Sequence, residues 1–256
     1  MIELSINILP IIIITGLIAG FIDAIAGGGG LLTIPALLGI GLPPHLALGT
    51  NKLAASFGSS TAAITFYRKQ LFKPTLWWRS FVATAVGAVC GAFIVDWVSK
   101  AWLDKLLPAI IIGSALYTIV SQRSTHRLYK DDAFIQCHPC KQITQGLALG
   151  VYDGFAGPGI GAFWLVSSMA LYRLSMLLCA GLAKAMNFTS NFVSLLTFIY
   201  LGHVNWLIGL TLGISIMIGA FFGAHSAIRF GEGFIRPIFI TVVIILAGKL
   251  AWQAGF

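Results

Sequence analysis

Charged side chains are rare within the apolar parts of this sequence, and the clear cases form two pairs. Asp23 and Lys52 lie in the first half of the chain, and Asp153 and Lys184 lie in the second. Long stretches without any charge surround them, residues 185–228 among these. A charge inside a bilayer costs several kcal/mol unless it is paired or hydrated, so such residues usually mark a functional site. The lysines could bind an anion and the aspartates could carry a proton. Alternatively, both could form ion pairs that only hold helices together.

Composition places these charges inside a membrane. The chain has 256 residues, of which 58% are hydrophobic and 9% are charged, whereas a soluble domain carries about 25% charged residues. A membrane-spanning helix needs roughly 20 mainly apolar residues, and several stretches qualify. The first of them has no small-residue cleavage site after it and is followed by equally apolar stretches, so we expect a retained helix. The sequence therefore predicts an all-α, polytopic integral membrane protein.

The chain contains an internal duplication. Residues 16–27 read GLIAGFIDAIAG and residues 146–157 read GLALGVYDGFAG, so two glycines, the aspartate and the final Ala-Gly recur in register. Four repeated glycines are expected at helix-packing positions, namely Gly16, Gly20, Gly87 and Gly91 with their second-half mates. The duplication divides the chain into a first membrane repeat at 1–122, a cytoplasmic linker at 123–142 and a second membrane repeat at 143–256.

Each repeat predicts the same series of five apolar segments. The expected segments are 9–26, 31–42, 46–66, 76–95 and 103–121, and then 143–157, 160–172, 178–201, 205–227 and 234–252. The 31–42 segment would rise only about 18 Å as a helix, which is too short for roughly 30 Å of hydrocarbon. The first two segments of each repeat therefore form a re-entrant hairpin or a broken, tilted pair. Either pair crosses an even number of times and three helices follow, so the two repeats are expected to be inverted.

Loop charges favour the same inverted topology. The 67–79 loop carries four basic residues and no acid, whereas its counterpart at 202–206 carries no charge. Positive loops face the cytoplasm, and equivalent loops change sides between inverted repeats. The basic linker would then be cytoplasmic and both termini would face the outside. The net charge of +8 is explained by this orientation and does not indicate nucleic-acid binding.

A glycine-rich break follows each intramembrane aspartate. The breaks comprise Gly27, Gly28, Gly29 and Gly30 after Asp23, and Gly157, Pro158 and Gly159 after Asp153. Broken backbone at membrane depth is tolerated only inside protein or beside a watery cavity, and the alternative is a close helix contact. No Gly-Lys-Ser/Thr ends either run, so we expect no nucleotide loop. A short helix should start near Ile34 with Thr33 as a possible cap, and such a helix N-terminus attracts anions.

Polar residues accompany the two lysines at helical spacing. One stripe is formed by Lys184, Asn187, Asn191 and Ser194, and the other by Lys52, Ser56 and Ser59, with Thr50 and Asn51 just before the lysine. The stripes could line a substrate route or form interhelical hydrogen bonds. Elsewhere, Cys137 and Cys140 form a single C-x-x-C, which is half a metal site at most. We predict neither a bound metal nor a cofactor.

Two runs of residues resemble a known family. The run GFIDAIAGGGGLLTIPAL at 20–37, followed by ALGTNK at 47–52, is similar to the sulfite exporter TauE/SafE family, also called the toluene sulfonate uptake permease family. The resemblance covers essentially the whole chain, although Thr50 and Asn51 have no identical counterpart in the second half. It implies a multi-pass transporter of the bacterial inner membrane that carries sulfur-containing anions such as sulfite, sulfoacetate or other organosulfonates.

Together these observations predict a secondary transporter with one central site. Because no ATP-binding motif is present, we expect transport to be driven by an ion gradient or by the substrate gradient itself. The expected substrate-binding residues are Gly27, Gly28, Gly29, Gly30, Thr50, Asn51, Lys52, Gly157, Pro158, Gly159, Lys184 and Asn187. Asp23 and Asp153 would bind a coupling proton or pair with the lysines. The expected partners are a small anionic substrate and the lipid bilayer, and the oligomeric state stays open. The alternatives are a cation transporter that uses the two aspartates, a membrane-embedded hydrolase built on Ser59 and a structural subunit.

Overall fold

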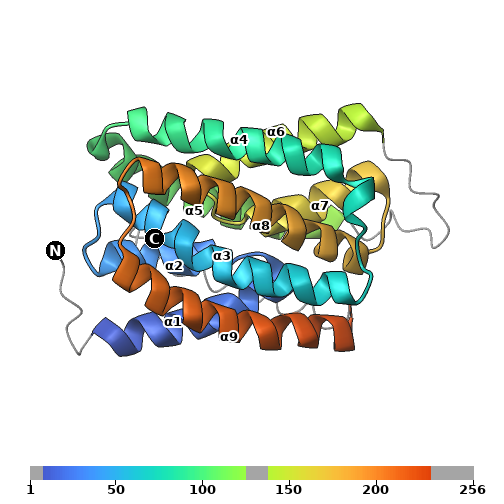
Figure 1. Cartoon of the computed structure of the whole chain (residues 1–256), viewed down its shortest axis with the longest axis horizontal. Coiled ribbons are helices and arrows are strands. Elements are labelled where there is room, and N and C mark those ends of the chain that lie inside the picture. Colours follow the sequence, from blue (N-terminus) through green and yellow to red (C-terminus); the bar gives the residue numbers. More distant parts are fainter. Residues whose placement is uncertain (1–7, 125–137, 232–256) are drawn as a thin grey trace.

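The computed structural model describes residues 8–124 and 138–231, and the regular elements within these ranges are all helices (Figure 1). They are α1 (Ile8–Ala26), α2 (Gly30–Gly39), α3 (Pro44–Arg68), the 3-10 turn η1 (Pro74–Leu76), α4 (Trp78–Trp97), α5 (Lys100–Ser124), α6 (Pro139–Phe155), α7 (Ile160–Tyr172), α8 (Met176–Tyr200) and α9 (Trp206–Phe230). The predicted segments agree with these bounds to within a few residues. The segment expected at 234–252 and Cys137 lie outside the described residues.

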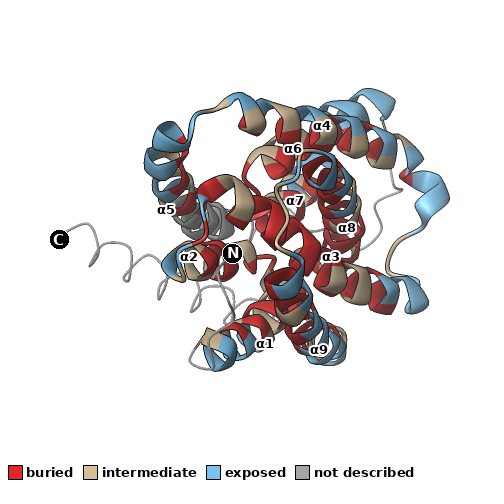
Figure 2. Cartoon of the chain, turned by 60° about the vertical axis from the view of Figure 1, so that its left-hand side comes forward, coloured by how far each residue is buried: buried red, intermediate tan, exposed pale blue. Residues whose placement is uncertain are grey.

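Helix length and surface fit a membrane protein that crosses the bilayer several times. Among the described helices, α1, α4 and α9 are long and apolar enough to span a membrane. α3 and α8 have 25 residues each, a rise of about 37 Å, but their polar stripes face the protein interior. Large apolar side chains such as Ile14, Val82 and Phe222 are exposed on the outer helices (Figure 2). An apolar outer surface of this extent suits contact with lipid.

Each repeat begins with a helical hairpin. In the first, Ile12 near the start of α1 packs in one cluster with Leu42, which follows α2. In the second, Tyr172 at the end of α7 donates a hydrogen bond of 2.9 Å to the side-chain oxygen of Gln145 near the start of α6. The chain therefore enters and leaves at the same end of the bundle in both cases. Both arrangements that the sequence left open, the re-entrant hairpin and the broken, tilted pair, return the chain to the same end, so the choice between them stays a prediction.

The start of α2 differs from the sequence-based expectation. The helix begins at Gly30, and Gly29 occupies the capping position without a side-chain hydrogen bond. Thr33 lies within the first turn, so the prediction that it caps the helix is wrong. Its hydroxyl bonds the carbonyl oxygen of Gly29 at 3.1 Å and the side-chain oxygen of Asn51 at 2.5 Å. Thr33 thus joins α2 to α3.

Helices of one repeat pack against helices of the other through closely packed glycines. α4 lies along α6, and α9 lies along α1. In Figure 1, α1 and α9 begin at the left-hand end and run to the right, whereas α4 and α6 begin at the right-hand end. A Cβ on Gly91 would overlap the carbonyl oxygen of Val151, and a Cβ on its counterpart Gly223 would overlap that of Phe21. The predicted packing role of these repeated glycines is confirmed.

This packing makes alanine costly at Gly91. We expect Gly91→Ala to lower the free energy of unfolding by about 1–3 kcal/mol, because the new methyl group forces α4 away from α6. Gly113→Ala in α5 is the matched control, because a Cβ there meets open space and alanine favours a helix. The measurement is the unfolding midpoint of both variants in the same detergent. Equal midpoints would contradict the close contact between α4 and α6.

Candidate functional site

The two glycine-rich breaks touch one another in the centre of the bundle. Gly27, with φ +79°, lies so close to Gly161 that a Cβ on either residue would overlap the backbone of the other. Gly157, with φ +88°, has Asp153 and Lys52 beside it, and a Cβ there would lie 2.6 Å from the aspartate carboxylate. Only glycine combines a left-handed backbone with this closeness of approach. The breaks therefore bring the two repeats into direct backbone contact.

A small cavity of about 30 Å³ lies at this crossing. Among the predicted site residues, those that line it are Asp23, Gly27, Gly29, Gly30, Asn51, Asp153, Gly157 and Asn187. Thr33 and Asn191 also line it. A cavity needs about 10–15 Å³ of such volume to hold one water molecule, so this one admits only one or two. An oxyanion larger than water can enter only when helices move apart.

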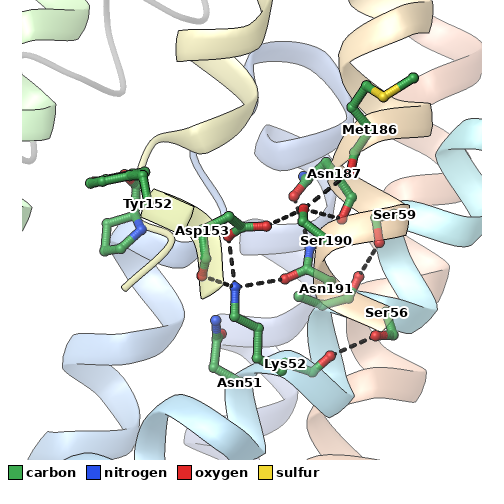
Figure 3. Close-up of polar contacts among 12 residues, drawn as sticks. Asn51, Lys52, Ser56, Ser59, Tyr152, Asp153, Met186, Asn187, Ser190 and Asn191 are labelled. Carbon is green, nitrogen blue, oxygen red and sulfur yellow. Dashed lines mark hydrogen bonds and ion pairs between the residues drawn. The ribbon is translucent and has the colours of Figure 1, made fainter. Parts of the chain in front are cut away.

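Lys52 pairs with the aspartate of the other repeat (Figure 3). Its Nζ lies 2.7 Å from the Oδ1 of Asp153 and 2.5 Å from the backbone carbonyl oxygen of the same residue. It also donates to the Oδ1 of Asn191 at 3.2 Å. The side chains of Lys52 and Asp153 are each only 1% exposed. Such a buried charge pair is stable only because hydrogen bonds satisfy both partners.

Lys184 makes the reciprocal pair with Asp23, but this pair is looser. Its Nζ donates to the backbone carbonyl oxygen of Asp23 and lies 3.4 Å from the carboxylate Oδ2. The other carboxylate oxygen, Oδ1, accepts a 3.0 Å hydrogen bond from the backbone N–H of Gly29. The Asp23 side chain is 17% exposed. Each lysine thus binds the aspartate at the break of the opposite repeat.

The difference between the pairs comes from residues that the duplication does not preserve. Ser190 donates a hydrogen bond to the Oδ2 of Asp153 and Asn191 accepts one from Lys52. Their counterparts, at the spacing that relates Lys184 to Lys52, are Gly58 and Ser59. Glycine has no side chain, and the Ser59 hydroxyl donates to the carbonyl oxygen of Ala55 in its own helix. The Lys52–Asp153 pair is therefore held by additional contacts that the Lys184–Asp23 pair lacks.

Other predicted residues do not line the cavity. Gly28 is buried within the first break. Pro158 lies next to Gly30, where a Cβ on Gly30 would lie 3.4 Å from the Cα of Pro158. Gly159 caps α7 with φ +77°. Thr50 is further away, where its hydroxyl accepts a 2.9 Å hydrogen bond from the N–H of Asn205. Sequence reasoning missed Ser190, although its place three residues after Asn187 continues the polar stripe of α8.

The stripe on α8 offers a matched pair of serines. Ser190 bonds the Asp153 carboxylate, whereas the hydroxyl of Ser194, one turn later, is buried without a hydrogen-bond partner among the described residues. We expect Ser190→Ala to lower the free energy of unfolding by about 1.5–3 kcal/mol, because it removes a hydrogen bond to a charged group. Ser194→Ala should be close to neutral. Unfolding midpoints measured in one detergent check the contrast, and a larger loss in the Ser194 variant would refute it.

The electrostatics of the cavity combine two kinds of group. The first residues of α2 and the N-terminal end of α7 border it through Gly30 and Ile160, and helix N-termini carry partial positive charge. Both aspartates also line it, and the lysines point at these aspartates. Within the described residues, His, Cys, Asp and Glu side chains form no group of three or more that could hold a metal ion. Cys140 is exposed in the first turn of α6.

Comparison with known proteins gives a consistent result over nearly the whole chain. Residues 12–250 match the family described as "Sulfite exporter TauE/SafE". A "Probable membrane transporter protein" of Haemophilus influenzae is 34% identical over 99% of this chain and 98% of its own length. The "Probable membrane transporter protein YfcA" of Escherichia coli is 34% identical over 96% of this chain and 91% of its own. The related protein YunE of Bacillus subtilis is 25% identical over 96% and 98%, respectively. No solved structure matches.

Proposed function

Because the chain belongs to the sulfite exporter TauE/SafE family of membrane transporters, we propose that it is a secondary transporter of a small sulfur-containing anion, such as sulfite or an organosulfonate. The proposed binding site is the cavity where the two breaks meet. The observation that carries the proposal is that, at this cavity, the lysine of each repeat pairs with the aspartate of the other. A site shared by both repeats can open to either side when one repeat moves against the other.

The groups that remain once the ion pairs open support an anionic substrate. The N-terminal ends of α2 and α7 both border the cavity, and backbone N–H groups at such ends favour negative charge. Lys52 and Lys184 reach the same breaks from α3 and α8. An anion that enters would replace an aspartate carboxylate as the partner of a lysine.

The coupling that we propose is the uptake of a proton by an aspartate. A proton that neutralises Asp23 would free Lys184 for the anion, so proton and anion would bind together. A proton and an anion together leave the site less negative than the anion alone. This favours joint entry, because charges of the same sign repel one another more strongly in a low-dielectric surrounding. Asp23 is the better candidate of the two aspartates, because its side chain is 17% exposed whereas that of Asp153 is 1% exposed.

One observation favours a cation as the second candidate. The side chains that line the closed cavity are rich in oxygen, since they include Asp23, Asp153, Asn51, Asn187 and Asn191. Carboxylate and amide oxygens are ligands for hard cations, and a cavity of about 30 Å³ suits a single ion. In this alternative the lysines would serve to neutralise the aspartates while the site is empty.

Flux into proteoliposomes tests the proposal. We expect labelled sulfite to accumulate in vesicles that contain the purified protein and to follow an imposed pH gradient. Parallel vesicles would receive labelled sodium under the same gradient. Sulfite flux without sodium flux supports the anion carrier, and the converse supports the cation carrier. Absence of both sulfite flux and organosulfonate flux under the imposed pH gradient would overturn the proposed substrate class.

A further inference from the structure

The same turn ends α3 and α8, at opposite ends of the bundle. After α3, Gln70 has φ +57° and the N–H of Leu71 bonds the carbonyl oxygen of Phe66 at 3.1 Å. After α8, Gly202 has φ +75° and the N–H of His203 donates to the carbonyl oxygen of Phe198 at 2.9 Å. The two turns are equivalent under the duplication. We therefore interpret a difference in the residues around them as a difference in function.

Polar contacts close the end that contains the turn after α8. His203 Nε2 lies 2.7 Å from the Oδ1 of Asp96 at the end of α4. The N–H of Asn205 donates to the hydroxyl of Thr50 at 2.9 Å. The ring of His45, at the start of α3, lies 5.2 Å from the His203 ring and is tilted by 37° against it. These contacts fill the space between the turn and the neighbouring helices.

The equivalent place at the other end is open and apolar. There the counterparts of His203, Asn205 and Thr50 are Leu71, Lys73 and Leu182, which cannot form the same contacts. All three line a cavity of about 360 Å³ between the α3–α4 loop and the start of α8. Further leucines complete its wall, including Leu76, Leu174 and Leu178. No residue that lines it lines the central cavity, so it is a separate site.

Residues typical of a membrane interface adjoin the lining of this cavity. Trp78 is 56% exposed, and the guanidinium of Arg79 lies 5.3 Å from the centre of its ring. Tyr67 is exposed and packs against Phe72, which lines the cavity. Tryptophan and tyrosine gather where lipid headgroups meet the hydrocarbon. Lys73 lines the cavity and is exposed, and residues 67–79 carry four basic residues and no acid.

We propose that this cavity binds an anionic phospholipid. One acyl chain would lie among the leucines and Phe72, and the phosphate would lie at Lys73. The apolar wall excludes a small hydrated anion as the principal occupant, because such a solute would lose its water without gaining hydrogen bonds. The basic loop supplies the charge complementarity, since basic pockets between membrane helices bind anionic headgroups. Lipid in this place would brace the α3–α4 loop against α8, as polar contacts do at the other end.

The test measures the unfolding midpoint of the full chain in a neutral detergent while lipid is titrated. Phosphatidylglycerol should raise the midpoint, whereas phosphatidylcholine and free glycerol phosphate should not. Lys73→Gln should weaken the apparent phosphatidylglycerol affinity about fivefold, and Leu178→Trp, which fills the cavity, should abolish the shift. Lys100→Gln at the opposite end is the matched control and should behave as the wild type.

Native mass spectrometry provides the second readout. It measures how many phosphatidylglycerol molecules each chain retains. We expect retention by the wild type and the Lys100 variant, and loss in the Leu178 variant. Equal shifts with phosphatidylcholine would overturn the headgroup assignment. A shift with free glycerol phosphate would show a site for soluble anions. Undiminished phosphatidylglycerol binding in both cavity variants would place the lipid elsewhere and overturn the proposal.

Discussion

Replacement of Lys52 by methionine is expected to abolish transport and to lower the free energy of unfolding by about 3–5 kcal/mol. The ammonium of Lys52 bonds Asp153 and Asn191 in a place where lysine and aspartate side chains are each 1% exposed. Methionine has a similar length but no charge, so the carboxylate of Asp153 would be left buried without its partner, which is the costly case for a buried pair. Sulfite flux into proteoliposomes and denaturant unfolding in detergent measure the two effects.

A double variant separates the structural role of Lys52 from its role in transport. Lys52→Met combined with Asp153→Asn removes both charges, so most of the lost stability should return while flux stays absent. Lys184→Met is the matched comparison on the other pair. Its stability loss should be smaller, because Asp23 is 17% exposed and keeps its hydrogen bond from Gly29. Normal flux in either lysine variant would show that the pairs only hold helices together.

The sequence predicted the helices and the central residues because these depend on local pattern. Charge-free stretches mark apolar helices, and an aspartate followed by glycines marks each break. The spacing of Lys184, Asn187 and Asn191 places them on one helix face, and in the structure they lie together at the site. The short second segment predicted a short helix, and the structure has one in each repeat, α2 with 10 residues and α7 with 13.

The pairing of charges could not be predicted, because it depends on how distant segments pack. Lys52 and Asp153 are 101 residues apart in sequence, and Lys184 and Asp23 are 161 residues apart. Either lysine could equally have been expected to bind the aspartate of its own repeat. Contact across the repeats arises because Gly27 and Gly161 bring the two breaks together. The start of α2 was missed for a different reason. Glycine usually interrupts a helix, whereas here the helix begins at Gly30.

The unequal pairs lead to the second large expected effect. Asp23→Asn should abolish sulfite flux driven by a pH gradient and leave sulfite exchange measurable when no gradient is imposed. The asparagine amide oxygen can still accept the hydrogen bond from the Gly29 N–H, so the break should keep its shape. It cannot take up a proton and release it across the transport cycle. Gradient-driven uptake and exchange of labelled sulfite, measured in the same vesicles, provide the test.

Asp153→Asn should behave differently, because the Asp153 side chain is 1% exposed and lies 2.7 Å from Lys52, whereas that of Asp23 is 17% exposed and lies 3.4 Å from Lys184. Both oxygens of the Asp153 carboxylate are engaged, one by Lys52 and one by Ser190, and an amide in this place leaves Lys52 buried without a counter-charge. We therefore expect loss of driven flux and of exchange, together with a fall in the unfolding free energy of about 3–5 kcal/mol. If Asp153→Asn kept exchange and Asp23→Asn lost it, the coupling proton would belong to the tighter pair. If both variants kept gradient-driven flux, neither aspartate would carry the proton, and the asymmetry produced by Ser190 and Asn191 would concern stability alone.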